Sequence, residues 1–166
     1  KSTVAVEFAQ NEYKSYILID FNKAKKKIKD AFESLDDLDV FFQTLTLEYN
    51  TKLYPRESLI IFDEIQKFPK AREAIKYLVA DGRYDYIETG SLISIKENVE
   101  NITIPSEERK MQMYPVNFEE FMVYMGEEIL LDYIRECFDN NQPLDRQMHN
   151  KAMHLFMEYM LVGGMP

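Results

Sequence analysis

The strongest constraint on the fold is a run of four apolar residues, 59–62 (LIIF), that leads directly into Asp63 and Glu64. A short continuous apolar run of this kind is typical of a strand buried on both faces of a sheet. Residues 16–20 (YILID) have the same character, and residues 84–88 predict a third strand. Because segments with helical periodicity separate these strands, the sequence predicts parallel βαβ units and an α/β fold.

Helices are expected between and around the strands, over residues 3–9, 23–35, 38–48 and 69–82. The last is the best defined, because Pro69 fits a first turn, Gly82 fits the end, and apolar residues recur between them at helical spacing. The lysines of residues 23–29 are interpreted as the solvated face of a helix, not as a nucleic-acid contact. Weaker strand candidates are residues 102–104 and 111–114.

After Pro115 the chain becomes continuously helical in character. Asn117, with Glu120 three positions later, predicts a helix that begins with a capping box. Further helices are expected over residues 127–138 and 144–161. We therefore expect an α/β core over residues 1–116 and a helical appendage over residues 117–166.

Composition narrows the partners that the chain can have. Its 166 residues are 46% hydrophobic and 13% aromatic, which is typical of a folded globular protein. With 20 basic and 29 acidic residues the formal net charge is −9, so direct nucleic-acid binding is not expected. The single cysteine, Cys137, cannot form an internal disulfide, and no apolar run approaches the roughly 18 residues of a membrane span. We expect a cytoplasmic protein without a signal peptide or a membrane partner.

The first residues, Lys1, Ser2 and Thr3, look like the last part of a phosphate-binding loop, G-x-x-x-x-G-K-[ST]. In such a loop the lysine reaches the β- and γ-phosphate oxygens and the hydroxyl binds Mg²⁺. The chain has no initiating methionine and ends at Pro166, directly after two glycines. We therefore expect both ends to be cut, with the glycine-rich half of the loop and the strand before it outside the chain.

Asp63 and Glu64 stand where an apolar strand ends, which is the pattern of a Walker B element. Open parallel sheets bind ligands outside the carboxyl ends of their strands. In that interpretation Asp63 holds Mg²⁺ through water and Glu64 polarises the water that attacks the γ-phosphate. The alternative is that both acids simply begin a polar loop. Thr89 and Ser91, in the turn after the third strand, are both candidates for a γ-phosphate sensor, and the sequence does not choose between them.

These motifs stand in one order along the chain: KST (1–3), YILIDF (16–21), LIIFDEIQ (59–66), YIETGS (86–91), MYPVNFEEF (113–121) and LVGGMP (161–166). In this combination the chain resembles the prokaryotic AAA-type ATPases called AAA_14, which carry a DUF4143 domain at the C-terminus. The resemblance implies a P-loop NTPase (RecA/AAA-like) fold. Its parts would be a three-layer αβα core with a parallel sheet over residues 1–116, then the start of a helical lid over residues 117–166. The first strand of this fold class is expected near the centre of a sheet with the order 5-1-4-3-2.

The resemblance also implies the ligands, ATP and Mg²⁺, and the residues that serve them. These are Lys1, Ser2 and Thr3 at the nucleotide, Ser2 and Asp63 at Mg²⁺, Glu64 to activate water, and Thr89 or Ser91 as the sensor. Hydrolysis of MgATP in the intact parent is expected to drive a conformational change. The C-terminal domain would pass that change to a protein partner or to another copy. Without the glycine-rich loop and a central strand, the isolated fragment is expected to be inactive.

Three alternatives stay open at this point. A nucleotide-binding switch with little turnover shares every residue named above. A protein-interaction module without a working nucleotide site uses the acidic surface for its partners. A carboxylate nuclease built on Asp20, Asp63 and Glu64 is poorly supported, because the chain lacks a suitably spaced lysine and a basic surface. Neither Arg83 nor Arg109 is assigned as the arginine that ring ATPases supply in trans.

Overall fold

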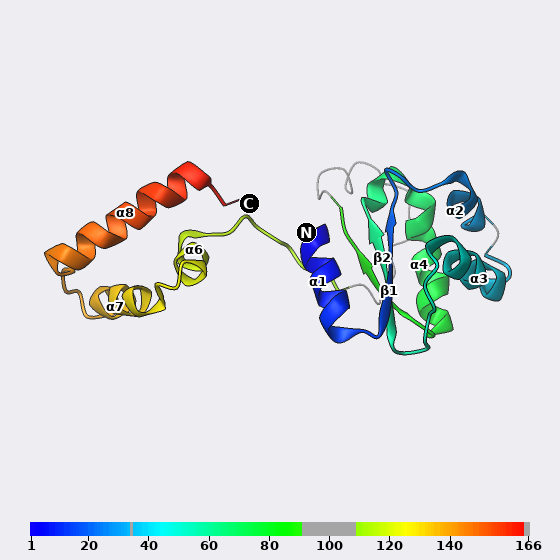
Figure 1. The fold of residues 1–166 in the computed structure, drawn as a ribbon, viewed down its shortest axis with the longest axis horizontal. Coiled ribbons are helices and arrows are strands. Elements are labelled where there is room, and N and C mark those ends of the chain that lie inside the picture. The colour runs from blue at the N-terminus through cyan, green and yellow to red at the C-terminus, as the bar shows by residue number, and fades with distance from the viewer. Residues whose placement is uncertain (34, 91–108, 165–166) are drawn as a thin grey trace. The chain divides into compact units, whose positions relative to one another are not determined.

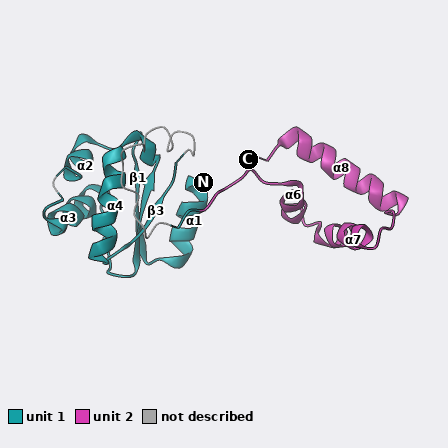
Figure 2. Cartoon of the chain, turned by 180° about the vertical axis from the view of Figure 1, so that it is seen from behind, with its two compact units in different colours: residues 1–110 teal, residues 111–166 magenta. Residues whose placement is uncertain are grey.

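The structure is a computed structural model, and it describes residues 1–33, 35–90 and 109–164. The chain divides into two compact units, residues 1–110 and residues 111–166 (Figure 2). Each unit has a hydrophobic core of its own.

The first unit is built on a parallel sheet with the strand order β1-β2-β3. The strands are β1 (Ser15–Asp20), β2 (Ser58–Asp63) and β3 (Asp85–Glu88). In the register of the sheet, Asp20 lies opposite Asp63 and Glu88 lies opposite Phe62. Every residue of β2 is buried, as its continuous apolar sequence and its central position require. The strands predicted over residues 16–20, 59–62 and 84–88 are confirmed.

Helices cover both faces of this sheet (Figure 1). They are α1 (Ser2–Glu12), α2 (Lys26–Ala31), α3 (Leu38–Tyr49) and α4 (Pro69–Asp81). Leu59 and Ile61 of β2 form a core with α1 on one face, and Ile60 and Phe62 form a core with the other three helices on the opposite face. Successive residues of a strand point to opposite faces, so β2 contributes to both cores. The predicted three-layer α/β fold is confirmed.

The segment that joins β2 to α4 determines how β2 ends. After Asp63 the backbone of Glu64 turns into the left-handed region, with φ 56° and ψ 44°. A single turn of 3₁₀ helix, η1 (Ile65–Lys67), follows at once. Pro69 then occupies the first turn of α4, and Gly82 ends that helix with a positive φ of 71°, as the sequence predicts.

The second unit is helical throughout its regular structure. Its described helices are α6 (Phe118–Tyr124), α7 (Glu128–Asp139) and α8 (Arg146–Val162). The predicted capping box is present: Asn117 Oδ1 accepts from the Glu120 N–H, and Glu120 Oε2 accepts from the Asn117 N–H, each at 2.8 Å. Met122, Leu130 and Leu155 form the centre of the core between these helices.

Two predictions about elements are wrong. Residues 111–114 form no strand, since Met111 and Tyr114 are 82% and 72% exposed and no neighbouring strand bonds their backbone in the described residues. The helix predicted over residues 23–35 is too long, because a turn precedes α2. In that turn the Asp20 carboxylate accepts a hydrogen bond from the Asn22 N–H at 2.9 Å. The strand candidate at residues 102–104 lies outside the described residues.

Candidate functional site

Three oxygen-bearing side chains from distant parts of the sequence meet where β2 ends. Asp63 is the last residue of β2 and is only 8% exposed. Its Oδ1 accepts a hydrogen bond from Ser2 Oγ at 2.6 Å and another from Thr89 Oγ1. A buried carboxylate needs such donors, because burial without hydrogen bonds is costly. We call Ser2, Asp63 and Thr89 the carboxylate cluster.

The backbone explains why Thr89, one residue beyond β3, faces Asp63. The Thr89 N–H donates to the Phe62 carbonyl at 2.8 Å, and the Thr89 carbonyl accepts from the Ile65 N–H at 3.1 Å. The pairing of β3 with β2 therefore continues past the end of both strands and holds the Thr89 hydroxyl beside the carboxylate. Ser91, the other candidate for the sensor, lies outside the described residues.

The N-terminus of α1 supplies the remaining candidates for phosphate binding. Lys1 is exposed, and its Nζ donates to the carbonyl of Gly90, directly after Thr89, at 3.2 Å. Ser2 is the first residue of α1, and Thr3 is exposed in the first turn. The first N–H groups of a helix have no partner within it and favour an anion, so this end of α1 lies at the cluster with the polarity that phosphate needs.

Glu64 does not join the carboxylate cluster. It is half-buried, and its Oε2 accepts a hydrogen bond from Gln66 Nε2 at 2.6 Å. Its left-handed backbone is uncommon for a residue with a side chain and is found more often at functional sites than elsewhere. Gln66 was not singled out from the sequence, although it stands two residues after Glu64 within the LIIFDEIQ motif.

A second pair that sequence reasoning missed joins α4 to the residue before Thr89. Arg72 of α4 is 5% exposed, and its Nη1 lies 3.6 Å from Oε2 of Glu88, the last residue of β3. The pair ties α4 to the strand end that carries Thr89. The sequence gives no sign of this pair. Arg72 follows Ala71 in a helix whose other buried residues are apolar, so a buried charge is not expected there.

The model of the family described as "AAA domain" (AAA_14) matches residues 1–122. The chain belongs to the AAA_14 family of AAA domains. No curated protein and no solved structure matches it. Membership makes the chain a nucleotide-binding module of the AAA type, and the match spans the whole sheet together with the cluster at its edge.

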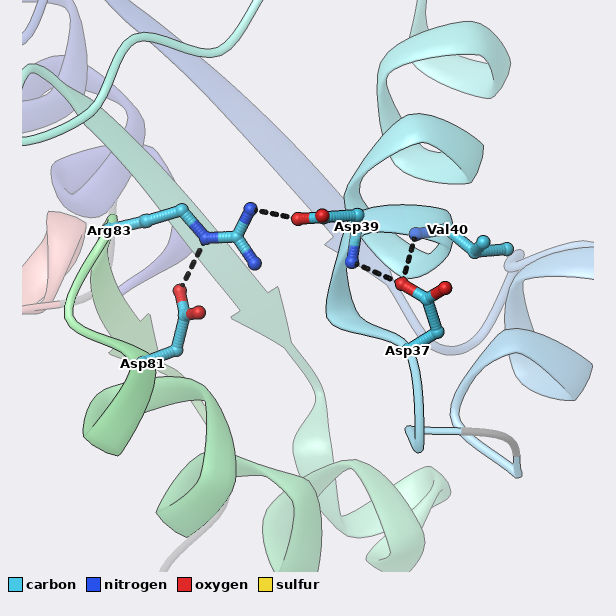
Figure 3. Close-up of polar contacts among 5 residues, drawn as sticks. All are labelled: Asp37, Asp39, Val40, Asp81 and Arg83. Atoms are coloured by element: carbon cyan, nitrogen blue, oxygen red, sulfur yellow. Dashed lines mark hydrogen bonds and ion pairs between the residues drawn. The ribbon is translucent and has the colours of Figure 1, made fainter.

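In this AAA_14 domain the Arg83 side chain makes structural contacts with Asp81 and Asp39 (Figure 3). Its Nε donates to Asp81 at 2.7 Å, its Nη1 donates to Asp39, and its guanidinium carbon lies 4.7 Å from the centre of the Phe42 ring. The hydrogen bonds to Asp81 and then Asp39 raise the pKa of Arg83. The residue precedes β3 and so lies at the opposite end of that strand from Thr89. Arg83 thus joins α3 to the end of α4, whereas Arg109 is exposed.

The AAA_14 domain offers little for a nuclease reaction at Asp20. Although Asp20 lies opposite Asp63, its Oδ1 accepts from the Asn22 N–H and its Oδ2 lies 3.5 Å from Lys23 Nζ. In the described ranges no three His, Cys, Asp or Glu side chains gather closely enough to hold a metal ion. The same ranges contain no helix long and apolar enough to cross a membrane.

Proposed function

We propose that this AAA_14 domain binds MgATP at the carboxylate cluster and, in the protein as its gene encodes it, takes part in the hydrolysis of ATP. The observation that supports the proposal is the convergence of Ser2 and Thr89 on Asp63. This convergence lies at the carboxyl ends of β2 and β3, where open parallel sheets bind their ligands. The family match supports the binding of a nucleotide, and the position of the carboxylate cluster supports the proposed location of the binding site.

The cluster fits a magnesium ion by its chemistry. Mg²⁺ takes oxygen ligands and keeps several waters, so one or two protein oxygens suffice. Ser2 Oγ and Asp63 Oδ1 are oxygens of this kind and lie 2.6 Å apart. When bound, Mg²⁺ neutralises charge that develops on the phosphates. Ser2 and Asp63 are the residues that would hold it.

The other residues take roles that follow from their positions. Lys1 exchanges its contact with the Gly90 carbonyl for phosphate oxygens, and Thr3 contributes its N–H at the start of α1. Thr89 turns its hydroxyl from Asp63 toward the terminal phosphate as the sensor, a role for which Ser91 stays a second candidate. Glu64 orients the attacking water and accepts its proton.

The wider assignment is also a proposal. Residues 1–116 are the nucleotide-binding core, and residues 117–166 begin a helical lid that moves when ATP is hydrolysed. A following DUF4143 domain passes this motion to a protein partner or to a second copy, in the cytoplasm of a prokaryote. The three helices described between Phe118 and Val162 support a lid.

A second candidate function is a nucleotide-binding switch with little turnover. It is favoured by one observation, the hydrogen bond that joins Glu64 to Gln66 while Glu64 makes none to the carboxylate cluster in the described residues. Such a protein binds MgATP but leaves its base unused.

Replacing Glu64 with glutamine tests the proposal. Glu64→Gln keeps the size of the side chain but cannot accept the proton, so we expect hydrolysis to fall by about a hundredfold or more. MgATP affinity should stay within about twofold, because Glu64 does not contact the carboxylate cluster. Phosphate release and calorimetry measure the two quantities. The control is Glu73→Gln, an exposed glutamate on α4.

Each outcome separates the candidates. Loss of hydrolysis with retained binding supports Glu64 as the base. Tight binding without measurable hydrolysis by the wild-type protein favours the switch. Hydrolysis by Glu64→Gln at the wild-type rate removes the assignment of Glu64.

A further inference from the structure

We propose that Gln66 is a positioning residue, whose side-chain amide holds the Glu64 carboxylate in the orientation from which it activates water. This role rests on the proposed function, because it concerns the partner of the proposed base. The contact that carries it is the hydrogen bond of 2.6 Å from Gln66 Nε2 to Glu64 Oε2.

The chemistry of the two groups determines which way the amide faces. An ionised carboxylate only accepts hydrogen bonds, so the amide nitrogen of Gln66, and not its oxygen, must point to Glu64. The oxygen, Oε1, is consequently buried without a hydrogen-bond partner in the described part of the chain. An unpaired buried carbonyl lowers stability. A glutamine that served stability alone would not leave one end unpaired, so the cost is consistent with a role at the site.

The contact leaves Glu64 able to act as a base. Gln66 donates to Oε2 of Glu64. The other carboxylate oxygen, Oε1 of Glu64, makes no hydrogen bond to the described residues and can accept a proton from water. The amide is neutral, whereas a lysine or arginine in its place would make the carboxylate a weaker base. One carboxylate oxygen is thus held and the other is available.

The backbone around this pair is itself anchored to the carboxylate cluster. Glu64 has its left-handed conformation, and Gln66 lies in η1. The residue between them, Ile65, is buried and donates its N–H to the carbonyl of Thr89 at 3.1 Å. The base, its partner and the proposed sensor therefore share one short backbone framework.

The hydrogen bond itself can be observed without any turnover. In a ¹⁵N-labelled protein, the side-chain amide signal of Gln66 is the one that Gln66→Met removes. We expect Glu64→Gln to shift that signal and the control Glu73→Gln to leave it in place. A signal that does not respond to Glu64→Gln overturns the contact.

Kinetics test whether the contact positions the base. Gln66→Met keeps the length of the side chain but removes the donor, so we expect kcat to fall by about tenfold or more. Affinity for a non-hydrolysable MgATP analogue should stay within about twofold. Stability should not fall, because the unpaired oxygen of Gln66 is removed as well. Gln43→Met, an exposed position on α3, serves as the control.

A double-mutant cycle distinguishes positioning from a general structural effect. In a Glu64→Gln background the residue that Gln66 acts through is already lost, so Gln66→Met should change the residual rate by less than about twofold. An equal fall in both backgrounds, or a rise of kcat in Gln66→Met, overturns the positioning role. Gln66→Glu, which replaces the donor with a second carboxylate, repeats the test should the methionine variant fold poorly.

Failure of this inference differs from failure of the proposed function. If Glu64→Gln is inactive and Gln66→Met retains the wild-type rate, only the role of Gln66 is lost. If the wild-type protein does not hydrolyse MgATP, or Glu64→Gln hydrolyses it normally, the proposed function itself is contradicted.

Discussion

At the scale of single residues, Asp63 combines a structural and a proposed functional role. It is buried at the end of the central strand, and two hydroxyl groups satisfy its Oδ1. The residues that stabilise this buried carboxylate, Ser2 and Thr89, are those proposed to act on the nucleotide. Under the proposed function, binding of MgATP exchanges hydrogen bonds within the carboxylate cluster, and the cluster would respond to the nucleotide.

Tyr86 gives a prediction about stability and pH. Its hydroxyl on β3 is buried without a hydrogen-bond partner among the described residues, and burial raises the pKa of Tyr86 above the usual value of 10.0. Because the pKa is higher in the folded state, the unfolded state loses its proton first as pH rises. The free energy of unfolding is therefore unaffected by this ionisation below pH 10 and falls as pH rises further. We expect Tyr86→Phe to be as stable as the wild type at pH 7, or more stable by up to about 1 kcal/mol.

Urea unfolding at pH 7 and above pH 10 measures this difference. Above pH 10 the variant should lose less stability than the wild type. It should still lose some, because another tyrosine with a raised pKa remains. Burial and the hydrogen bond to Asp85 also raise the pKa of Tyr13, to about 12. Tyr77→Phe, at an exposed position on α4, is the matched control. A Tyr86→Phe variant that is clearly less stable at pH 7 would contradict the unpaired state of the hydroxyl.

At the scale of elements, α6 depends on its capping box. The Asn117 and Glu120 side chains accept hydrogen bonds from each other's backbone N–H groups, which satisfies two backbone donors at the start of this short helix. Asn117→Ala removes the cap, so we expect the second unit to lose about 1 kcal/mol of stability. Hydrogen exchange of the α6 amides and thermal unfolding measure the loss.

A surface asparagine within a helix provides the comparison for this loss. Asn150 is exposed in the interior of α8, and Asn150→Ala should change stability by less than about 0.5 kcal/mol. If the two alanine variants are equally stable, the capping box does not stabilise α6.

The elements also show why some predictions from sequence succeed. β2 could be predicted because a short continuous apolar run is typical of a strand covered on both faces, and α4 because Pro69 and Gly82 mark its ends. Residues 111–114 have strand-like composition, but they have no partner strand in the described residues, and sequence alone does not reveal that. The late start of the helix predicted over residues 23–35 depended on a side-chain turn at Asp20.

At the scale of the whole molecule, the topology brings the parts of the candidate site together. Parallel strands place Asp63 and Thr89 at one edge of the sheet, and the direction of α1 places Ser2 there too. This arrangement of the three residues could be predicted from the order of the motifs along the chain. The preference for Thr89 depends on how far the pairing of β2 and β3 continues, and the contact of Gln66 depends on the left-handed turn at Glu64. Neither feature is visible in the sequence.

The most direct test of the proposed site is calorimetry of MgATP binding by the protein as its gene encodes it, with Asp63→Asn beside the wild type. We expect micromolar binding by the wild type. Binding should weaken by about tenfold or more in Asp63→Asn when Mg²⁺ is present, because that side chain is proposed to serve the ion. Asp85→Asn, at the other end of the sheet, should bind as the wild type does. Absence of binding by a folded wild-type protein, or equal binding by Asp63→Asn, would contradict the proposal.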